Sequence, residues 1–207
     1  MPVYNYTTID DPGATQGTVA SGINDAGQIV GTYLTGAGVH GFVDSGGTFT
    51  TLDDPSGIKT FATGINSAGH IVGYYTDSGG HDHAFFFSGG FDTLNNPLGT
   101  NVEGNDFYAE GINDLGWMVG AFSDANDALF GFLTGNGVNY TFIRDPLGVE
   151  DFGVGSQVLG TSYNAAKGLI YNVGSYFDSA FHQHGFFNDF FSGTYTTIDN
   201  PLGTNGT

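Results

Sequence analysis

Carboxylate and amide side chains recur immediately before proline in this chain, and these side chains are suitable ligands for a hard cation. Asp11, Asp54 and Asp145 each precede a proline, and asparagine takes the same place in two further copies of the phrase. Calcium binds about six to eight oxygens from carboxylates, amides and carbonyls, so the sequence predicts a calcium site with these three aspartates as ligands. The alternative is a set of capped turns, because Asx side chains bond to the local backbone and proline fixes φ.

Two pairs of histidines have the spacing of neighbours on one face of a strand. The pairs are His81 with His83 and His182 with His184. Imidazoles at this spacing can bind a transition metal. One member of each pair also shares a repeat position with His40, which favours a packing or hydrogen-bonding role. Asp178 and Asp189 are candidates to orient the second pair.

The third of four repeat units departs most from the common pattern. Glu110 replaces serine or threonine, Trp117 replaces glutamine or histidine, and Arg144 replaces aspartate or asparagine. An indole can stack on the apolar face of a sugar while charged groups bind its hydroxyls. The sequence therefore predicts a binding site for a glycan or small polar ligand formed by these three residues, with sequence drift as the alternative.

An enzyme, a hydrolase or a lyase, is the alternative function. Its site would lie on the third unit or near His182 and His184. Acid–base catalysis needs two converging carboxylates, and Glu103, Glu110 and Glu150 all lie in or beside the third unit. However, the chain has no G-x-S-x-G, phosphate-loop, H-E-x-x-H or dinucleotide motif.

Composition excludes several classes of partner. The 21 acidic residues against three basic ones give a net charge of −18, which would repel nucleic acid and anionic lipid. No apolar stretch is long enough for a spanning helix, so membrane insertion is not expected. The absence of cysteine excludes disulfides and thiolate chemistry, and the N-terminus does not resemble a classical signal peptide.

Internal repetition determines the expected architecture. The proline phrase returns at Pro12, Pro55, Pro97, Pro146 and Pro201, a period typical of stacked supersecondary units. A second phrase, G-I-N-x-x-G-x-I-V-G, begins at Gly22 and Gly64, has a close variant at Gly111, and is degraded around Asn164. We expect a hairpin at each Asn-x-x-Gly, with the glycine at positive φ.

Period-two patterns predict four short strands in each unit. In the first unit these include the strand before Asn24 and the segments 28–33, 40–44 and 48–53. The pattern before Asn24 suggests a strand with one bulky face, Val19 and Ile23, and one small face, Ala20 and Gly22. The same two faces are predicted in the other units, with Gly160 and Ser162 on the small face of the fourth.

The sequence thus predicts an all-β, propeller-like single repeat domain over residues 1–207, with about four to five small four-stranded antiparallel sheets. The units are 13–55, 56–97, 98–146 and 147–201, with an extra N-terminal strand at 3–9. A β-solenoid or β-prism is the alternative. The extra strand leaves three arrangements open: a closed ring with a surplus strand, an incomplete fifth sheet, or homo-oligomers formed through exposed strand edges.

The repeat pattern resembles the HAF-type repeats of bacterial, often extracellular, proteins. His83-Ala84-Phe85 is the literal match, the G-I-N phrase is the more specific one, and the resemblance covers nearly the whole chain. It implies a propeller-like β-repeat fold and an extracellular location, and it implies no catalytic residues. The expected function is therefore non-catalytic binding or surface interaction, with a glycan or small polar ligand and with calcium.

Overall fold

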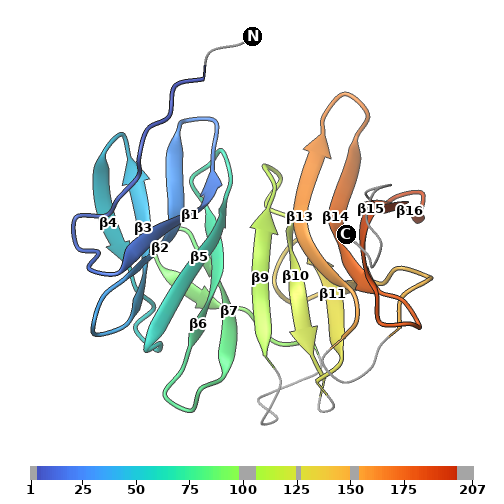
Figure 1. Ribbon diagram of the computed structural model, residues 1–207. Coiled ribbons are helices and arrows are strands. Elements are labelled where there is room, and N and C mark those ends of the chain that lie inside the picture. The colour runs from blue at the N-terminus through green and yellow to red at the C-terminus, as the bar shows by residue number, and fades with distance from the viewer. Residues whose placement is uncertain (1–3, 98–105, 125–126, 150–153, 200–207) are drawn as a thin grey trace.

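Four small antiparallel sheets make up the structure (Figure 1). The computed structural model describes residues 4–97, 106–124, 127–149 and 154–199, and it contains no helix in these ranges. Each sheet consists of four consecutive strands in chain order and is called a blade. Blade 1 holds β1 (Gly17–Ile23), β2 (Gln28–Leu34), β3 (Val39–Ser45) and β4 (Thr48–Leu52). Blade 2 holds β5 (Lys59–Ile65), β6 (Ile71–Thr76), β7 (Asp82–Phe87) and β8 (Phe91–Thr93).

The other two blades follow the same plan. Blade 3 holds β9 (Phe107–Ile112), β10 (Met118–Ser123), β11 (Leu129–Thr134) and β12 (Tyr140–Ile143). Blade 4 holds β13 (Gln157–Asn164), β14 (Leu169–Phe177), β15 (Gln183–Asp189) and β16 (Thr194–Ile198). The described residues contain no helix that is long and apolar enough to cross a membrane.

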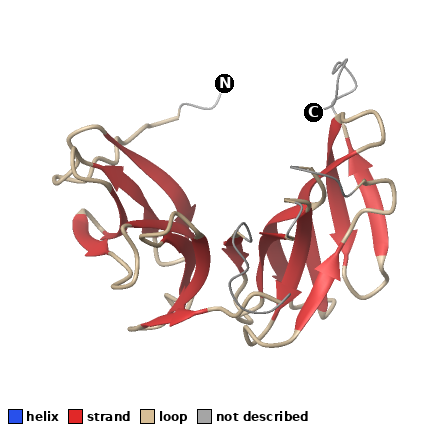
Figure 2. Cartoon of the chain, turned by 90° about the horizontal axis from the view of Figure 1, so that it is seen from below, coloured by secondary structure: helices blue, strands red, loops and turns tan. Residues whose placement is uncertain are grey.

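The blades are arranged as in a β-propeller, with the first strand of each blade next to the first strand of the following one. Packing between sheets joins blade 1 to blade 2, blade 2 to blade 3, and blade 3 to blade 4. The two terminal blades lie apart, so the described part of the chain forms an open arc (Figure 2). The predicted all-β, propeller-like fold is confirmed.

A β-bulge interrupts the first strand of every blade and corrects one expectation. In β1 the register shifts between Ala20 and Gly22, and a bulge places an extra residue in one strand. The two residues therefore point to opposite faces of the sheet, so the predicted strand with one small and one bulky face is wrong. Across the bulge lies Gly31, where an added Cβ would lie 1.9 Å from the carbonyl oxygen of Val19.

Glycines in the first strands allow the blades to approach closely. A Cβ on Gly22 would lie 3.3 Å from the Cα of Gly64, one on Gly64 3.2 Å from that of Gly111, and one on Gly111 3.4 Å from that of Gly160. The absence of side chains at these positions thus permits close packing of neighbouring sheets. Between the blades, apolar side chains from both sheets form the core, as where Val30 and Leu52 of blade 1 meet Ala62 of blade 2.

The fourth blade is aligned differently from the sequence expectation. The hairpin of β13 and β14 is longer, and the bulge falls between Val158 and Gly160. Val158 and Gly160 thus correspond to Ala62 and Gly64, two residues earlier than the predicted match. The degraded repeat phrase hid this shift because its Asn164 starts a different turn, in which its carbonyl oxygen accepts from the backbone N–H of Gly168 at 2.8 Å.

The predicted N-terminal strand is not formed. Residues 4–9 have no regular structure, and Val3 lies outside the described residues. Tyr4 and Tyr6 are exposed, so this segment lacks the burial that would hold it to a sheet. The outermost place in the fourth sheet is already taken by β16.

Candidate functional site

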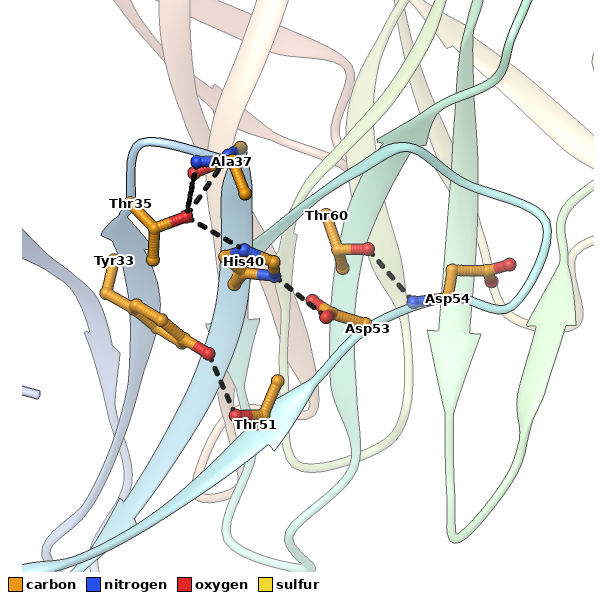
Figure 3. A network of polar contacts seen from close by, with 9 residues as sticks. Tyr33, Thr35, Ala37, His40, Thr51, Asp53, Asp54 and Thr60 are labelled. Atoms are coloured by element: carbon orange, nitrogen blue, oxygen red, sulfur yellow. Dashed lines mark hydrogen bonds and ion pairs between the residues drawn. The ribbon is translucent and has the colours of Figure 1, made fainter. Parts of the chain in front are cut away.

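The aspartates of the proline phrase cap turns. The Oδ1 atoms of Asp11, Asp54 and Asp145 accept hydrogen bonds from the backbone N–H two residues later, at 2.7, 2.8 and 2.9 Å. Their own backbone N–H groups donate to a hydroxyl at the start of the following blade, such as Thr60 Oγ1 at 2.9 Å from the nitrogen of Asp54 (Figure 3). The turn interpretation of the phrase is therefore confirmed.

The three predicted calcium ligands lie in three separate turns. Asp54 and Asp145 each have a buried Oδ2 atom without a hydrogen-bond partner. Calcium needs about six or more oxygens, and no group of three or more His, Asp or Glu residues that could hold a metal occurs in the described part of the chain. These residues therefore do not assemble a cation site, and calcium binding stays a prediction.

The histidines of the repeat stack on tyrosines and bond to aspartates. In blade 1 the ring of His40 lies 5.0 Å from that of Tyr33, and its Nδ1 is 2.8 Å from Asp53 Oδ2 (Figure 3). In blade 4 His184 stacks on Tyr176, with its Nδ1 2.9 Å from Asp199 Oδ2. The hydrogen bonds of His184 to Asp199 and Asp178 raise its pKa, and the bond to Asp199 contributes most. His83 stacks on Tyr75 in the same way, so one arrangement recurs in three blades and is structural.

In each histidine pair, at least one imidazole contacts an aspartate. His83 Nε2 lies 3.0 Å from Asp77 Oδ2. Asp178 Oδ2 lies 3.2 Å from His184 Nε2 and 3.5 Å from His182 Nδ1, so Asp178 is the residue that orients this pair. Asp189, the other candidate, caps the turn after β15 instead, through the backbone N–H of Phe191.

Arg144 is part of a variant of the same stack. In blade 3, Phe122 and Phe130 take the places of tyrosine and histidine, with ring centroids 5.3 Å apart. The guanidinium carbon of Arg144 lies 4.6 Å from the centroid of the Phe130 ring. A cation–π contact thus replaces the histidine–aspartate contact of blades 1 and 4, which explains why arginine accompanies phenylalanine here.

The asparagines of the G-I-N phrase connect neighbouring blades. Asn24 Oδ1 accepts from two N–H groups of its own turn, while its Nδ2 donates to the carbonyl oxygen of Asn66 at 3.0 Å. Asn66 donates likewise to Asn113 at 3.2 Å. The glycines of these turns, Gly27, Gly69 and Gly116, have positive φ as predicted. The G-I-N phrase therefore has a structural role, since its asparagines join neighbouring blades by hydrogen bonds.

The three residues predicted to bind a ligand do not come together. Glu110 is the extra residue of the bulge in β9, where burial raises its pKa to about 7. Trp117 packs in the core between blades 3 and 4, with its ring 6.1 Å from that of Phe190. Trp117 lies against Gly135, just beyond one end of β11, whereas Arg144 contacts Phe130, near the other end of that strand. Five residues of strand span about 16 Å, so one small ligand cannot contact both. Glu103 and Glu150 lie outside the described residues.

A groove between blades 2 and 3 is the strongest candidate site among the described residues. Its volume is about 440 Å³. It is lined by His70, Phe86, Asp92, Thr93, Leu94, Asn95, Gly116, Met118, Gly135, Asn136, Gly137 and Val138. The ring of His70 meets the Phe86 ring edge to face at 5.3 Å.

Sequence reasoning missed this groove. Trp117 occupies the equivalent place in the next blade, where its indole fills the space before blade 4. In blade 2 the smaller ring of His70 leaves this space open. The only sequence signal was the change of residue type at this one repeat position, from glutamine to histidine to tryptophan.

Comparisons with known proteins find similarity among solved structures. The chain matches no protein-family model and no curated protein sequence. A triple arginine-to-alanine mutant of AofleA from Arthrobotrys oligospora is 14% identical, with 97% of this chain and 63% of that one covered and a TM-score of 0.51. The fucose-recognising lectin of Aleuria aurantia, a six-bladed β-propeller, is 13% identical, with 86% and 58% covered and a TM-score of 0.46.

An enzyme is also among the solved structures that this chain matches. Fructan 1-exohydrolase IIa from Cichorium intybus, bound to 1-kestose, is 13% identical, with 83% of this chain and 41% of that one covered and a TM-score of 0.41. The chain spans about three fifths of the length of the AofleA and Aleuria aurantia structures. At 14% identity and a TM-score of 0.51, the match to AofleA supports the fold alone.

Proposed function

We propose that this protein is a non-catalytic carbohydrate-binding protein whose site is the groove between blades 2 and 3. The observation that carries the proposal is that both apolar and polar side chains line this groove. Its volume of about 440 Å³ falls in the range of small-molecule sites, about 300 to 1,000 Å³. A monosaccharide or disaccharide is a suitable occupant for a space of this size.

The chemistry of the lining fits a sugar. The rings of Phe86 and His70 offer an apolar surface for the C–H face of a pyranose, and the carboxylate of Asp92 and the amide of Asn95 offer partners for hydroxyl groups. Asp92 and Asn95 are both exposed, so their polar groups are accessible without rearrangement. A negatively charged ligand is disfavoured because the chain carries a net charge of −18.

Two rigid walls form the site. The Nδ2 donor of Asn66, at the turn before His70, ties blade 2 to the backbone of Asn113 in blade 3. On the other wall, Tyr140 donates from its hydroxyl to the carbonyl oxygen of Gly137 at 2.9 Å. A groove held by such contacts is preorganised, which lowers the entropic cost of binding.

Calorimetric titration with a panel of neutral monosaccharides and disaccharides tests the proposal. The panel includes fucose, the sugar named for the Aleuria aurantia lectin. For a sugar that binds, Asp92→Asn should weaken binding about tenfold, since a hydrogen bond to a charged group contributes about 1.5 to 3 kcal/mol. Asp10→Asn, which removes an exposed carboxylate outside the groove, is the matched control. Equal affinities of the two variants would refute this site.

A further inference from the structure

The last blade exposes the same positions that the other blades bury. Each blade turns one face toward the next blade, and in blades 1, 2 and 3 this face carries Val30, Val72 and Val119, all 0% exposed. The register places Val173 at this position in blade 4, paired with Gly160 as Val72 is paired with Gly64. Val173 is 45% exposed. Among the described residues, no blade packs against this face of blade 4.

A second position on this face behaves in the same way. This position lies at the end of the outermost strand of a blade or directly after it. In blades 1 to 3 it is occupied by Leu52, Leu94 and Ile143, which are 6%, 8% and 2% exposed. The equivalent Ile198 of blade 4 is 53% exposed. Both positions are therefore far more exposed in blade 4 than in blades 1 to 3.

The glycine contact between the blades is also incomplete at this end. Space for a Cβ on Gly22, Gly64 or Gly111 is closed by backbone of the following blade. For a Cβ added at Gly160, the only atom found within 4 Å belongs to Val173 of the same sheet. The first strand of blade 4 thus keeps room for the backbone of another first strand.

The opposite face of blade 1 has the complementary features. In blades 2 and 3 the face turned toward the preceding blade buries Ala62 and Ala109 completely and leaves Ile65 and Ile112 8% exposed. In blade 1 the equivalent Ala20 is exposed, and Ile23 is 67% exposed. In the described part of the chain, therefore, no sheet packs on this face of blade 1.

We infer that the free face of blade 4 docks onto the free face of blade 1 of a second copy of this chain. The occupant is identified by continuity with an interface that the fold builds three times. Each time a face with Val and Leu or Ile meets a face that carries Ala62, Ala109 or Val158, with close glycine contacts. Because the two faces differ, the contact is heterologous. It rests on positions apart from the proposed sugar groove.

Sedimentation velocity and light scattering at increasing protein concentration test the inference. The wild-type mass should rise from that of one copy to that of at least two, and more readily at higher salt, because salt screens the repulsion between chains of net charge −18. Val173→Asp and Ile23→Asp should each reduce the mass to that of one copy. Leu115→Asp, which charges an exposed apolar residue on a turn outside both faces, should associate as the wild type does.

A mixing experiment distinguishes this pairing from any other contact. Val173→Asp retains an intact blade 1 face and Ile23→Asp an intact blade 4 face, so an equimolar mixture should form a one-to-one heterodimer although neither variant associates alone. Circular dichroism of each variant verifies the fold. A wild-type protein that remains a single copy up to its solubility limit, or a mixture that stays monomeric, overturns the inference.

Discussion

Glu110, at the bulge position of β9, provides a quantitative test of how ionisation at this position affects the stability of the fold. Its side chain lies on the first strand of blade 3, and burial raises its pKa from 4.5 to about 7. At this bulge position Thr63 of blade 2 donates to the carbonyl oxygen of Ala109 in the next blade at 2.7 Å. The carboxylate of Glu110 cannot donate in this way when it is ionised. We therefore expect the ionised side chain to destabilise the fold.

The magnitude follows from linkage. A pKa raised by about two and a half units corresponds to about 3 kcal/mol in the free energy of unfolding once the group is ionised in both states. Between pH 4.5 and about 7 the folded protein holds one proton more than the unfolded chain at Glu110. Stability from this group is therefore lost as the pH rises through that window, and it is retained below it.

Replacing Glu110 by glutamine removes the titration while keeping the shape. Glu110→Gln should be more stable than the wild type by about 3 kcal/mol at about pH 8.5, and the two should converge at about pH 4, below the pKa of the unfolded chain. Urea unfolding followed by fluorescence of Trp117, the single tryptophan, measures both. Histidine titrations are common to the two proteins and cancel in the difference. The same difference at both pH values, or a less stable variant at high pH, would show that the reasoning is wrong.

Three further predictions concern the frame around the sites. Gly73→Ala should unfold the protein or destabilise it by about 4 kcal/mol or more, because the added Cβ would lie 1.9 Å from the carbonyl oxygen of Phe61. The control is Gly36→Ala, whose added Cβ would have no atom within 4 Å and should leave the melting temperature unchanged. Asp199→Asn should lower the pKa of His184, because its carboxylate raises that pKa in the wild type, and proton NMR titration measures the shift. Calcium, if bound by the folded state, should raise the melting temperature after EDTA treatment, and an unchanged value would remove the calcium proposal.

Local features of the fold were predictable because they depend on residues close together in sequence. Asn66 and Gly69 define a hairpin through bonds that span only a few residues. Asp11, Asp54 and Asp145 each accept a hydrogen bond from a backbone N–H only two residues ahead. Period-two alternation predicted most of the strands, and recurrence of the phrases predicted four equivalent sheets. Such signals survive in a single sequence because the partner atoms are near neighbours in the chain.

Other features depended on contacts between distant segments. The bulge between Ala62 and Gly64 reverses which side chains share a face, and no residue type in the strand marks this reversal by itself. His70 and Asn136 line one groove although they belong to different blades, whereas Trp117 and Arg144 of one repeat unit lie at opposite ends of their blade.

The amino-acid sequence by itself determined the repeat, its strands and its turns. Only the tertiary structure decided which repeated positions meet and which remain exposed, as the contrast between buried Val119 and half-exposed Val173 illustrates. The physical reason is that burial depends on the presence of a neighbouring blade, and two identical side chains differ in energy according to what packs against them.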